Sequence, residues 1–173
     1  RLGSARRIFC VGLRSSFPIA YMFHYVSSLF GGETALVDGP GGIGVDALRV
    51  AASCDVLLAV SVNPYTCQTV QIAQHCVERG VPVVALTDSV VAPIGRIASD
   101  VVIIPTETAS FFHTMVPALA AIECLAALVA ARASEKTLKM LSASEAQLAA
   151  FDTYIVSRQK KSGRSRRPAR SGS

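Results

Sequence analysis

The sequence has few charged residues and no long uncharged apolar run. Only 17% of its 173 residues are charged and 51% are hydrophobic, which excludes an intrinsically disordered chain. No window of 18 residues is both apolar and uncharged, because the longest candidate, residues 116–131, contains Glu123. We therefore expect one globular domain with a substantial core and no membrane association.

The sequence also lacks a CxxC pair, a regular cysteine framework and clustered metal ligands. Its five cysteines are Cys10, Cys54, Cys67, Cys76 and Cys124. An odd number of irregularly spaced cysteines indicates free thiols, so we expect a reducing, cytoplasmic location. The histidines His24, His75 and His113 have no acidic or cysteine partners at metal-ligand spacing, so we expect no metal site. Of the three, only His113 is a candidate site residue.

The positive charge is confined to the C-terminal end. The formal net charge of the whole chain is +5, but residues 158–173 contain seven Lys and Arg and no acid. The first 157 residues carry ten bases and twelve acids, a net charge of −2. Residues 158–173 are predicted to form a disordered basic tail. Contact with a polyanion and a solvated end without a specific role are both compatible with this composition.

Apolar segments alternate with helical patterns along the chain. The predicted strands are residues 7–11, 34–37, 55–60, 81–87 and 100–104. The predicted helices are residues 19–30, 45–52, 66–79, 93–98 and 109–132. This alternation predicts an α/β three-layer sandwich with a five-stranded parallel sheet in the order 2-1-3-4-5. We assign residues 1–141 to this domain and residues 142–157 to a C-terminal amphipathic helix.

Two hydroxyl-rich loops are expected to meet at one edge of this sheet. In the order 2-1-3-4-5, the ligand-binding switch point lies between the first and third strands. Ser15 and Ser16 follow the first strand, and residues 61–66 follow the third. Thr66 precedes a helix, and a helix N-terminus attracts anions. The pattern predicts an anion site, although these hydroxyls would also suit strand ends and helix caps.

One glycine-rich segment imitates a nucleotide-binding motif. Residues 39–44 read Gly-Pro-Gly-Gly-Ile-Gly and satisfy G-x-G-x-x-G. The dinucleotide fingerprint belongs to the first strand–helix turn and needs an acid at the end of the next strand. Here the segment follows the second predicted strand, and the next strand ends in Val60-Ser61. We therefore interpret it as a flexible loop and expect no cofactor.

Further motifs lie at residues 12–16, 61–66, 80–89 and 111–112, together with Pro93. These motifs resemble the SIS (sugar isomerase) domain, and more closely the effector domain of RpiR-type bacterial transcriptional regulators. The resemblance covers about residues 5–150. It implies a flavodoxin-like five-stranded sheet, pairing of copies through long helices, and binding of a phosphosugar.

The resemblance also assigns ligand-binding positions. The loop pattern S-x-S-G-x-T of the third strand matches Ser61 and Thr66, whereas Asn63 replaces a serine and Pro64 a glycine. Proline removes one N–H group from the expected phosphate cradle. SIS isomerases have an acid–base glutamate in a region that corresponds to the neighbourhood of Glu107 in this sequence.

The first-strand pattern of the family, G-x-G-S-S, matches Gly12, Ser15 and Ser16, but Arg14 replaces the second glycine. An arginine there can hold a phosphate or carboxylate through two hydrogen bonds. The expected ligand-binding residues are Arg14, Ser15, Ser16, Ser61, Asn63 and Thr66.

The resemblance implies a phosphosugar-sensing effector domain of a bacterial transcriptional regulator. The chain begins at Arg1 rather than Met, so we expect a helix-turn-helix domain upstream whose DNA binding the ligand modulates. We also expect a homodimer or higher homo-oligomer. A phosphosugar isomerase and a plain interaction domain are the alternatives. Isomerisation needs a positioned base, and these loops are poor in acids, so we expect no catalytic residue.

Overall fold

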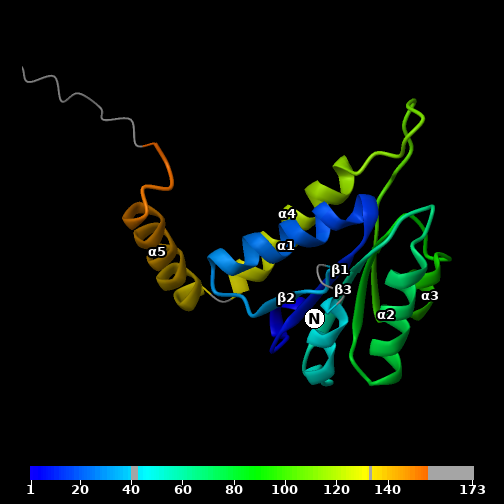
Figure 1. The fold of residues 1–173 in the computed structure, drawn as a ribbon, viewed down its shortest axis with the longest axis horizontal. Coiled ribbons are helices and arrows are strands. Elements are labelled where there is room, and N and C mark those ends of the chain that lie inside the picture. The colour runs from blue at the N-terminus through cyan, green and yellow to red at the C-terminus, as the bar shows by residue number, and fades with distance from the viewer. Residues whose placement is uncertain (40–42, 133, 156–173) are drawn as a thin grey trace, which may run out of the picture.

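The computed structural model describes residues 1–39, 43–132 and 134–155. The described residues up to 132 form a three-layer α/β fold, and the last helix projects from it (Figure 1). All strand pairs of the sheet are parallel, and the order is β2-β1-β3-β4-β5. The strands are β1 Ile8–Gly12, β2 Thr34–Leu36, β3 Val56–Val60, β4 Val83–Thr87 and β5 Asp100–Ile103. The predicted fold class and strand order are confirmed.

Helices cover both faces of the sheet (Figure 1). The α-helices are α1 Phe17–Leu29, α2 Cys67–Glu78, α3 Pro93–Ile97, α4 Val116–Arg132 and α5 Ser134–Ala150. The 3-10 helices are η1 Leu2–Ser4, η2 Arg14–Ser16 and η4 Gly44–Val50. Helices α1 and α4 share one hydrophobic core with the sheet, whereas α2, α3 and η4 share the other.

The central strand β3 supplies side chains to both cores. All five of its residues are buried. Leu58 and Val60 belong to the core beneath α1 and α4, whereas Leu57 and Ala59 belong to the core beneath α2 and η4. Because successive side chains of a strand point to opposite faces, a strand covered on both faces is apolar throughout. This is why the apolar run of the sequence predicted the strand correctly.

The predicted helix over residues 109–132 is wrong at its start, since α4 begins at Val116. Pro117 lies in the first turn, where its missing N–H group costs no intrahelical hydrogen bond. The hydroxyl of Thr114 accepts a hydrogen bond from the N–H of Val116 at 3.3 Å and so satisfies a free donor at the helix start. Residues 109–115 instead form an irregular loop.

The predicted helix over residues 142–157 is also wrong in its bounds, because α5 runs from Ser134 to Ala150. The N–H of Thr153 donates to the carbonyl of Leu148, and the N–H of Asp152 donates to that of Ala149. Asp152 has φ 49°, in the left-handed region. Together these features form a Schellman motif, which ends a helix. The predicted tail over residues 158–173 lies outside the described residues.

No single helix among the described residues is both long and apolar enough to cross a membrane. One bent pair, Val116–Arg132 with Thr137–Ala150, meets the criterion by length and composition alone. Helix α4 buries Ala118, Ile122 and Ala126 against α1 and the sheet.

Two of the five free cysteines, Cys10 and Cys76, are buried in the two cores. Burial raises the pKa of the Cys10 thiol to about 12 and that of Cys76 to about 11. Both thiols therefore remain protonated and behave as small apolar groups. Cys54, Cys67 and Cys124 are exposed.

A buried carboxylate joins the starts of β1 and β3. Asp55 accepts two hydrogen bonds from the guanidinium of Arg6, at 2.9 and 2.8 Å, and one from the N–H of Ala52 at 2.9 Å. The Asp55 side chain is fully buried, whereas that of Arg6 remains 58% exposed. The hydrogen bond from Arg6 holds the pKa of Asp55 below its usual value, despite the opposing effect of burial.

The variant Asp55→Asn is expected to lower the melting temperature by roughly 4–8 °C at neutral pH, since hydrogen bonds to a charged group contribute about 2 kcal/mol. A depressed pKa stabilises the folded state above the unfolded value of about 4, and this contribution is lost as the pH falls through the folded pKa. Calorimetry from pH 7 to pH 3 should therefore show the two proteins converge. A difference that stays constant with pH would contradict the role of the Asp55 charge.

Candidate functional site

A candidate site lies at the carboxyl ends of β1 and β3. β1 lies between β2 and β3 in the sheet, and the helices that follow β1 and β3 cover opposite faces. The two connections therefore diverge, which leaves space between them at the switch point of the sheet. The turn after β1 and the loop over residues 61–66 lie at this end of the sheet (Figure 1).

The turn after β1 depends on a close approach at Gly12. A Cβ atom at Gly12 would lie 2.5 Å from the carbonyl oxygen of Ser16, so a larger residue does not fit this backbone. The turn continues as η2, in which Arg14 has φ 56°. Glycine adopts this left-handed conformation without steric cost, which explains the second glycine of the G-x-G-S-S pattern. Arg14 occupies the same conformation and adds an exposed guanidinium.

The loop after β3 leads directly into α2. Ser61 is buried, and its hydroxyl accepts a hydrogen bond from the N–H of Thr66 at 3.4 Å. Thr66 occupies the N-cap position of α2 in an extended conformation. Its side chain makes no capping hydrogen bond within the described chain. The hydroxyl of Thr66 and the first N–H groups of α2 are therefore left to meet an anion.

Asp88, directly after β4, positions the same loop. Its carboxylate accepts a hydrogen bond from the N–H of Asn63 at 3.4 Å. Burial raises the pKa of the Tyr65 hydroxyl, and the neighbouring Asp88 carboxylate raises it further. Tyr65 therefore stays neutral. The Asp88 carboxylate holds the loop through its hydrogen bond with the N–H of Asn63. The peptide bond between Asn63 and Pro64 is cis.

The two loops enclose a cavity of about 340 Å³. Its lining residues are Arg14, Ser15, Ser16, Val62, Pro64, Thr66, Phe111, Phe112 and His113. Four of the six predicted ligand-binding residues therefore lie together. Ser61 is not part of the lining, but it contacts the N–H of Thr66. Asn63 is not part of it either, and its side chain is exposed.

A third segment closes the cavity from the loop before α4. The Oγ of Ser15 and the Nε2 of His113 are hydrogen-bonded at 2.9 Å, although 98 residues separate them in the sequence. The imidazole of His113 stacks on Phe112, with ring centroids 4.2 Å apart. We did not predict Phe111 or Phe112 as site residues. The sequence signal for them was the resemblance to the regulator subset at residues 111–112.

The lining contains one cationic side chain, and its other groups are hydroxyls, an imidazole and apolar side chains. Arg14 carries a permanent charge, and the remaining polar groups are the hydroxyls of Ser15, Ser16 and Thr66 and the imidazole of His113. No Asp or Glu belongs to the lining. Glu107 is exposed and lies outside it. A cavity of donors without a carboxylate suits an anionic ligand.

Among the described residues, no group of three or more His, Cys, Asp or Glu side chains is placed to hold a metal ion. His75 lies in α2, His24 in α1 and His113 at the cavity. His24 is instead hydrogen-bonded through Nδ1 to the hydroxyl of Thr34 at 2.8 Å.

A model of the SIS domain family matches residues 1–129 of the chain. The chain belongs to the SIS domain family. Membership of this family is consistent with the flavodoxin-like strand order and with a cavity at the switch point. No curated protein matches the chain.

Three solved structures of other proteins share this fold. The sugar isomerase domain of an RpiR transcription factor from Sphaerobacter thermophilus is 29% identical, with a TM-score of 0.78 over 84% of this chain and 81% of that one. The Vibrio vulnificus NanR protein complexed with ManNAc-6P is 16% identical, with a TM-score of 0.73 over 87% of this chain and 58% of that one. A Methanococcus jannaschii protein with an inferred 3-hexulose-6-phosphate isomerase function is 14% identical, with a TM-score of 0.65 over 80% of this chain and 78% of that one.

Proposed function

We propose that this SIS domain is the phosphosugar-sensing effector domain of a bacterial transcriptional regulator. The regulator contacts DNA through a separate N-terminal helix-turn-helix domain and works in the cytoplasm. The observation that carries the proposal is the cavity at the switch point, which is lined by Arg14 and by three hydroxyl side chains, one of them that of Thr66 at the N-cap of α2. The similarity to an RpiR transcription factor and to NanR supports the same assignment.

The phosphate of the ligand lies between Arg14 and Thr66. The guanidinium donates two parallel hydrogen bonds to phosphate oxygens, and the hydroxyl of Thr66 donates a third. The free N–H groups at the start of α2 and the helix dipole add to the attraction. Ser61 positions this cradle, because its hydroxyl accepts a hydrogen bond from the N–H of Thr66. Ser16, at the N-cap of α1, makes no capping hydrogen bond within the described chain and is free to reach the ligand.

The sugar ring lies against the loop before α4. Phe112 and His113 form a stacked pair at the cavity wall, which offers a flat face to the C–H groups of a sugar ring. The hydroxyl of Ser15 is already hydrogen-bonded to His113, so a ligand hydroxyl that inserts there must replace or extend that bond. Binding therefore links the turn after β1 to the loop that begins α4.

The absence of acids from the lining favours a sensor over an isomerase. Aldose–ketose isomerisation needs a base within hydrogen-bond reach of the carbon-bound proton. Among the lining residues only the imidazole of His113 qualifies, and Ser15 holds its Nε2. A phosphosugar isomerase that uses His113 as the base is the second candidate function.

Helix α4 provides the route from the ligand to the rest of a dimer. One side of α4 is buried, whereas Val116 is 72% exposed and Leu128 is 65% exposed on the other. We propose that the exposed side contacts a second copy. Because the ligand-facing loop leads into α4, ligand binding biases how the two copies pair, and through that the spacing of the DNA-binding domains.

A sugar phosphate that binds this cavity is expected to raise the melting temperature by roughly 5–10 °C at saturating concentration, since a ligand present at 100 times its Kd stabilises by about 2.7 kcal/mol. Thermal shift should be measured with ManNAc-6P, hexose 6-phosphates, the matching free sugars and inorganic phosphate. The double variant Ser61→Ala/Thr66→Ala should abolish the shift. Ser28→Ala, which removes an exposed hydroxyl of α1 bonded to the carbonyl of Tyr25, should leave it intact.

A shift that persists in Ser61→Ala/Thr66→Ala would show that the ligand binds elsewhere. Each sugar phosphate that binds should also be incubated with the protein and followed by NMR for aldose–ketose conversion. Conversion that His113→Ala abolishes would establish the isomerase and overturn the sensor.

A further inference from the structure

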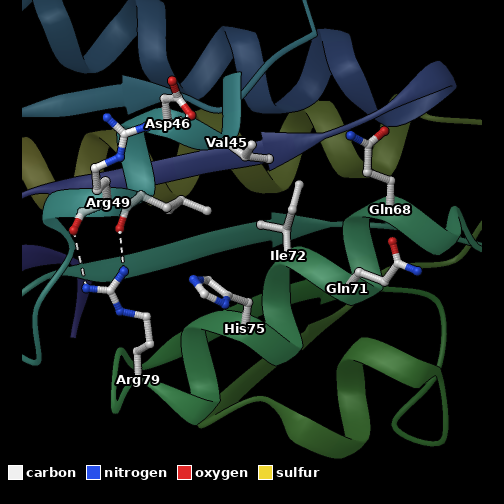
Figure 2. A pocket seen from close by; sticks show the side chains of 9 residues that line it. Val45, Asp46, Arg49, Gln68, Gln71, Ile72, His75 and Arg79 are labelled. Carbon is white, nitrogen blue, oxygen red and sulfur yellow. Dashed lines mark hydrogen bonds and ion pairs between the residues drawn. The ribbon is translucent and has the colours of Figure 1, made fainter. Parts of the chain in front are cut away.

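A second concave surface lies between α2 and η4, away from the candidate ligand cavity (Figure 2). We call it the α2–η4 groove, and its volume is about 480 Å³. Helix α2 and its C-cap residue contribute Gln68, Gln71, Ile72, His75 and Arg79, and η4 contributes Val45, Asp46, Leu48 and Arg49. The helical positions follow i, i+3, i+4 and i+7 spacing, so they form one continuous side of α2.

The walls of the groove are held in place by Arg79. Its guanidinium donates hydrogen bonds to the carbonyl oxygens of Leu48 at 3.2 Å, Arg49 at 3.3 Å and Ala51 at 3.3 Å, two of which Figure 2 shows. The carbonyls of Leu48 and Arg49 belong to the last turn of η4, and that of Ala51 follows it directly. The Leu48 carbonyl also accepts a hydrogen bond from the N–H of Ala51 at 3.0 Å. Arg79 therefore ties the end of α2 to the end of η4 through three of its five N–H donors.

The floor of the groove is apolar, and apolar side chains flank it. Leu48 and Ile72 are buried at the floor, while Val45 is 44% exposed at the wall. At the two ends of η4, Ile43 is 67% exposed and Val50 is 62% exposed. With Val45 they form a series of exposed apolar side chains along η4, which we call the η4 ridge. Exposed apolar surface of this kind marks a contact site.

The polar groups of the groove complement copies of themselves. Arg49 and Asp46 pair at 3.1 Å, and their side chains are 75% and 54% exposed. The carboxamides of Gln68 and Gln71 each offer a donor and an acceptor, and no hydrogen bond joins them to another residue drawn in Figure 2. Because acid and base lie side by side and the amides are neutral, a second groove turned by a two-fold axis meets no repulsion.

We propose that the α2–η4 groove is an isologous contact between two copies of this chain. The η4 ridge of each copy fills the groove of the other. Asp46 of each chain then faces the Arg49 of its mate, and the glutamine carboxamides pair across the axis. In such a contact residue i meets residue j twice, which requires a ridge and a groove on the same patch. A stable contact buries about 800 Å² per partner, so the side of α2 from Gln68 to Arg79, about 16 Å long, must be joined in the contact by η4.

This contact is separate from the α4 surface, so the two together produce a tetramer with two kinds of two-fold axis. It also lies on the helix whose N-cap residue, Thr66, lines the candidate ligand cavity. The contact itself requires no ligand, so its failure and that of the proposed sensor function are independent.

The masses of variants in solution test the proposal. Light scattering coupled to size-exclusion chromatography should give a mass of four copies for the wild type and two copies for Val45→Glu. Val90→Glu, at a valine outside the groove that is 63% exposed, should remain at four copies. Val45→Glu/Leu128→Glu should be a monomer, and circular dichroism should show native helix content for each variant.

A charge exchange distinguishes a direct contact from local unfolding. Arg49→Asp should halve the mass, because two acids then face two acids across the axis, and Asp46→Arg/Arg49→Asp should restore it. A wild type of two copies that Val45→Glu turns into a monomer also supports the groove. The proposal is overturned if Val45→Glu and Arg49→Asp leave the mass unchanged, or if the exchanged pair fails to restore it.

Discussion

Arg14→Gly is expected to weaken sugar-phosphate binding by about 30-fold, which corresponds to about 2 kcal/mol for hydrogen bonds to a charged group. The same change should leave the stability of the domain unchanged or slightly higher. Arg14 has φ 56°, and this left-handed conformation costs a residue with a Cβ about 1–2 kcal/mol. Relief of that cost offsets the additional entropy of glycine in the unfolded chain.

The Kd should be measured by isothermal titration calorimetry with the sugar phosphate that gives the largest thermal shift. Arg14→Lys is the matched control, since it keeps the charge but loses the two-pronged guanidinium, and a loss of about 5-fold is expected from weaker geometry. Equal affinity of wild type and Arg14→Gly would remove Arg14 from the site. A fall in affinity accompanied by unfolding would contradict our account of the φ angle.

Gly12→Val is expected to have the largest effect on stability of any single change at the site. The added Cβ would lie 2.5 Å from the carbonyl oxygen of Ser16 and 3.1 Å from the Cβ of Ala20. The obstacle at Ser16 is backbone rather than the end of a flexible side chain, so the turn must move away from β1. Overpacking of this kind costs about 3 kcal/mol or more, which lowers the melting temperature by roughly 6–12 °C.

Gly39→Ala provides the control, because a Cβ there has no neighbour within 4 Å. Its melting temperature should match the wild type. Gly12→Val should also lose the thermal shift with sugar phosphates, since η2 carries three of the cavity-lining residues. A stable Gly12→Val protein that still binds would show that the turn after β1 is not needed for the site.

The fold could be predicted from the sequence because its signals are local. The apolar run at residues 56–60 marks a strand covered on both faces, and its polar continuation marks the loop beneath a helix N-terminus. Alternation of such units with helical segments leads to a parallel sheet, and right-handed crossovers limit its order. The positions of Arg14, Ser15, Ser16 and Thr66 around one cavity followed from that order.

The helix bounds near the C-terminus were predicted wrongly for identifiable reasons. Composition alone extended α4 back to residue 109, whereas Thr114 and Pro117 begin it at Val116. The end of α5 depends on the left-handed conformation of Asp152, which most residue types avoid and composition does not reveal. Caps and turns at single residues, rather than apolar content, determine where these helices begin and end.

By itself the sequence determined the strand order, the switch point and the hydroxyl-rich loops there, because each is encoded in short segments of neighbouring residues. Only the tertiary structure brought His113 within 2.9 Å of Ser15 and Phe112 to the cavity wall, because 98 residues separate the two halves of that contact. It also placed η4 beside α2, where Arg79 joins them. Contacts between distant segments depend on how the helices pack on the sheet, and no local pattern records them.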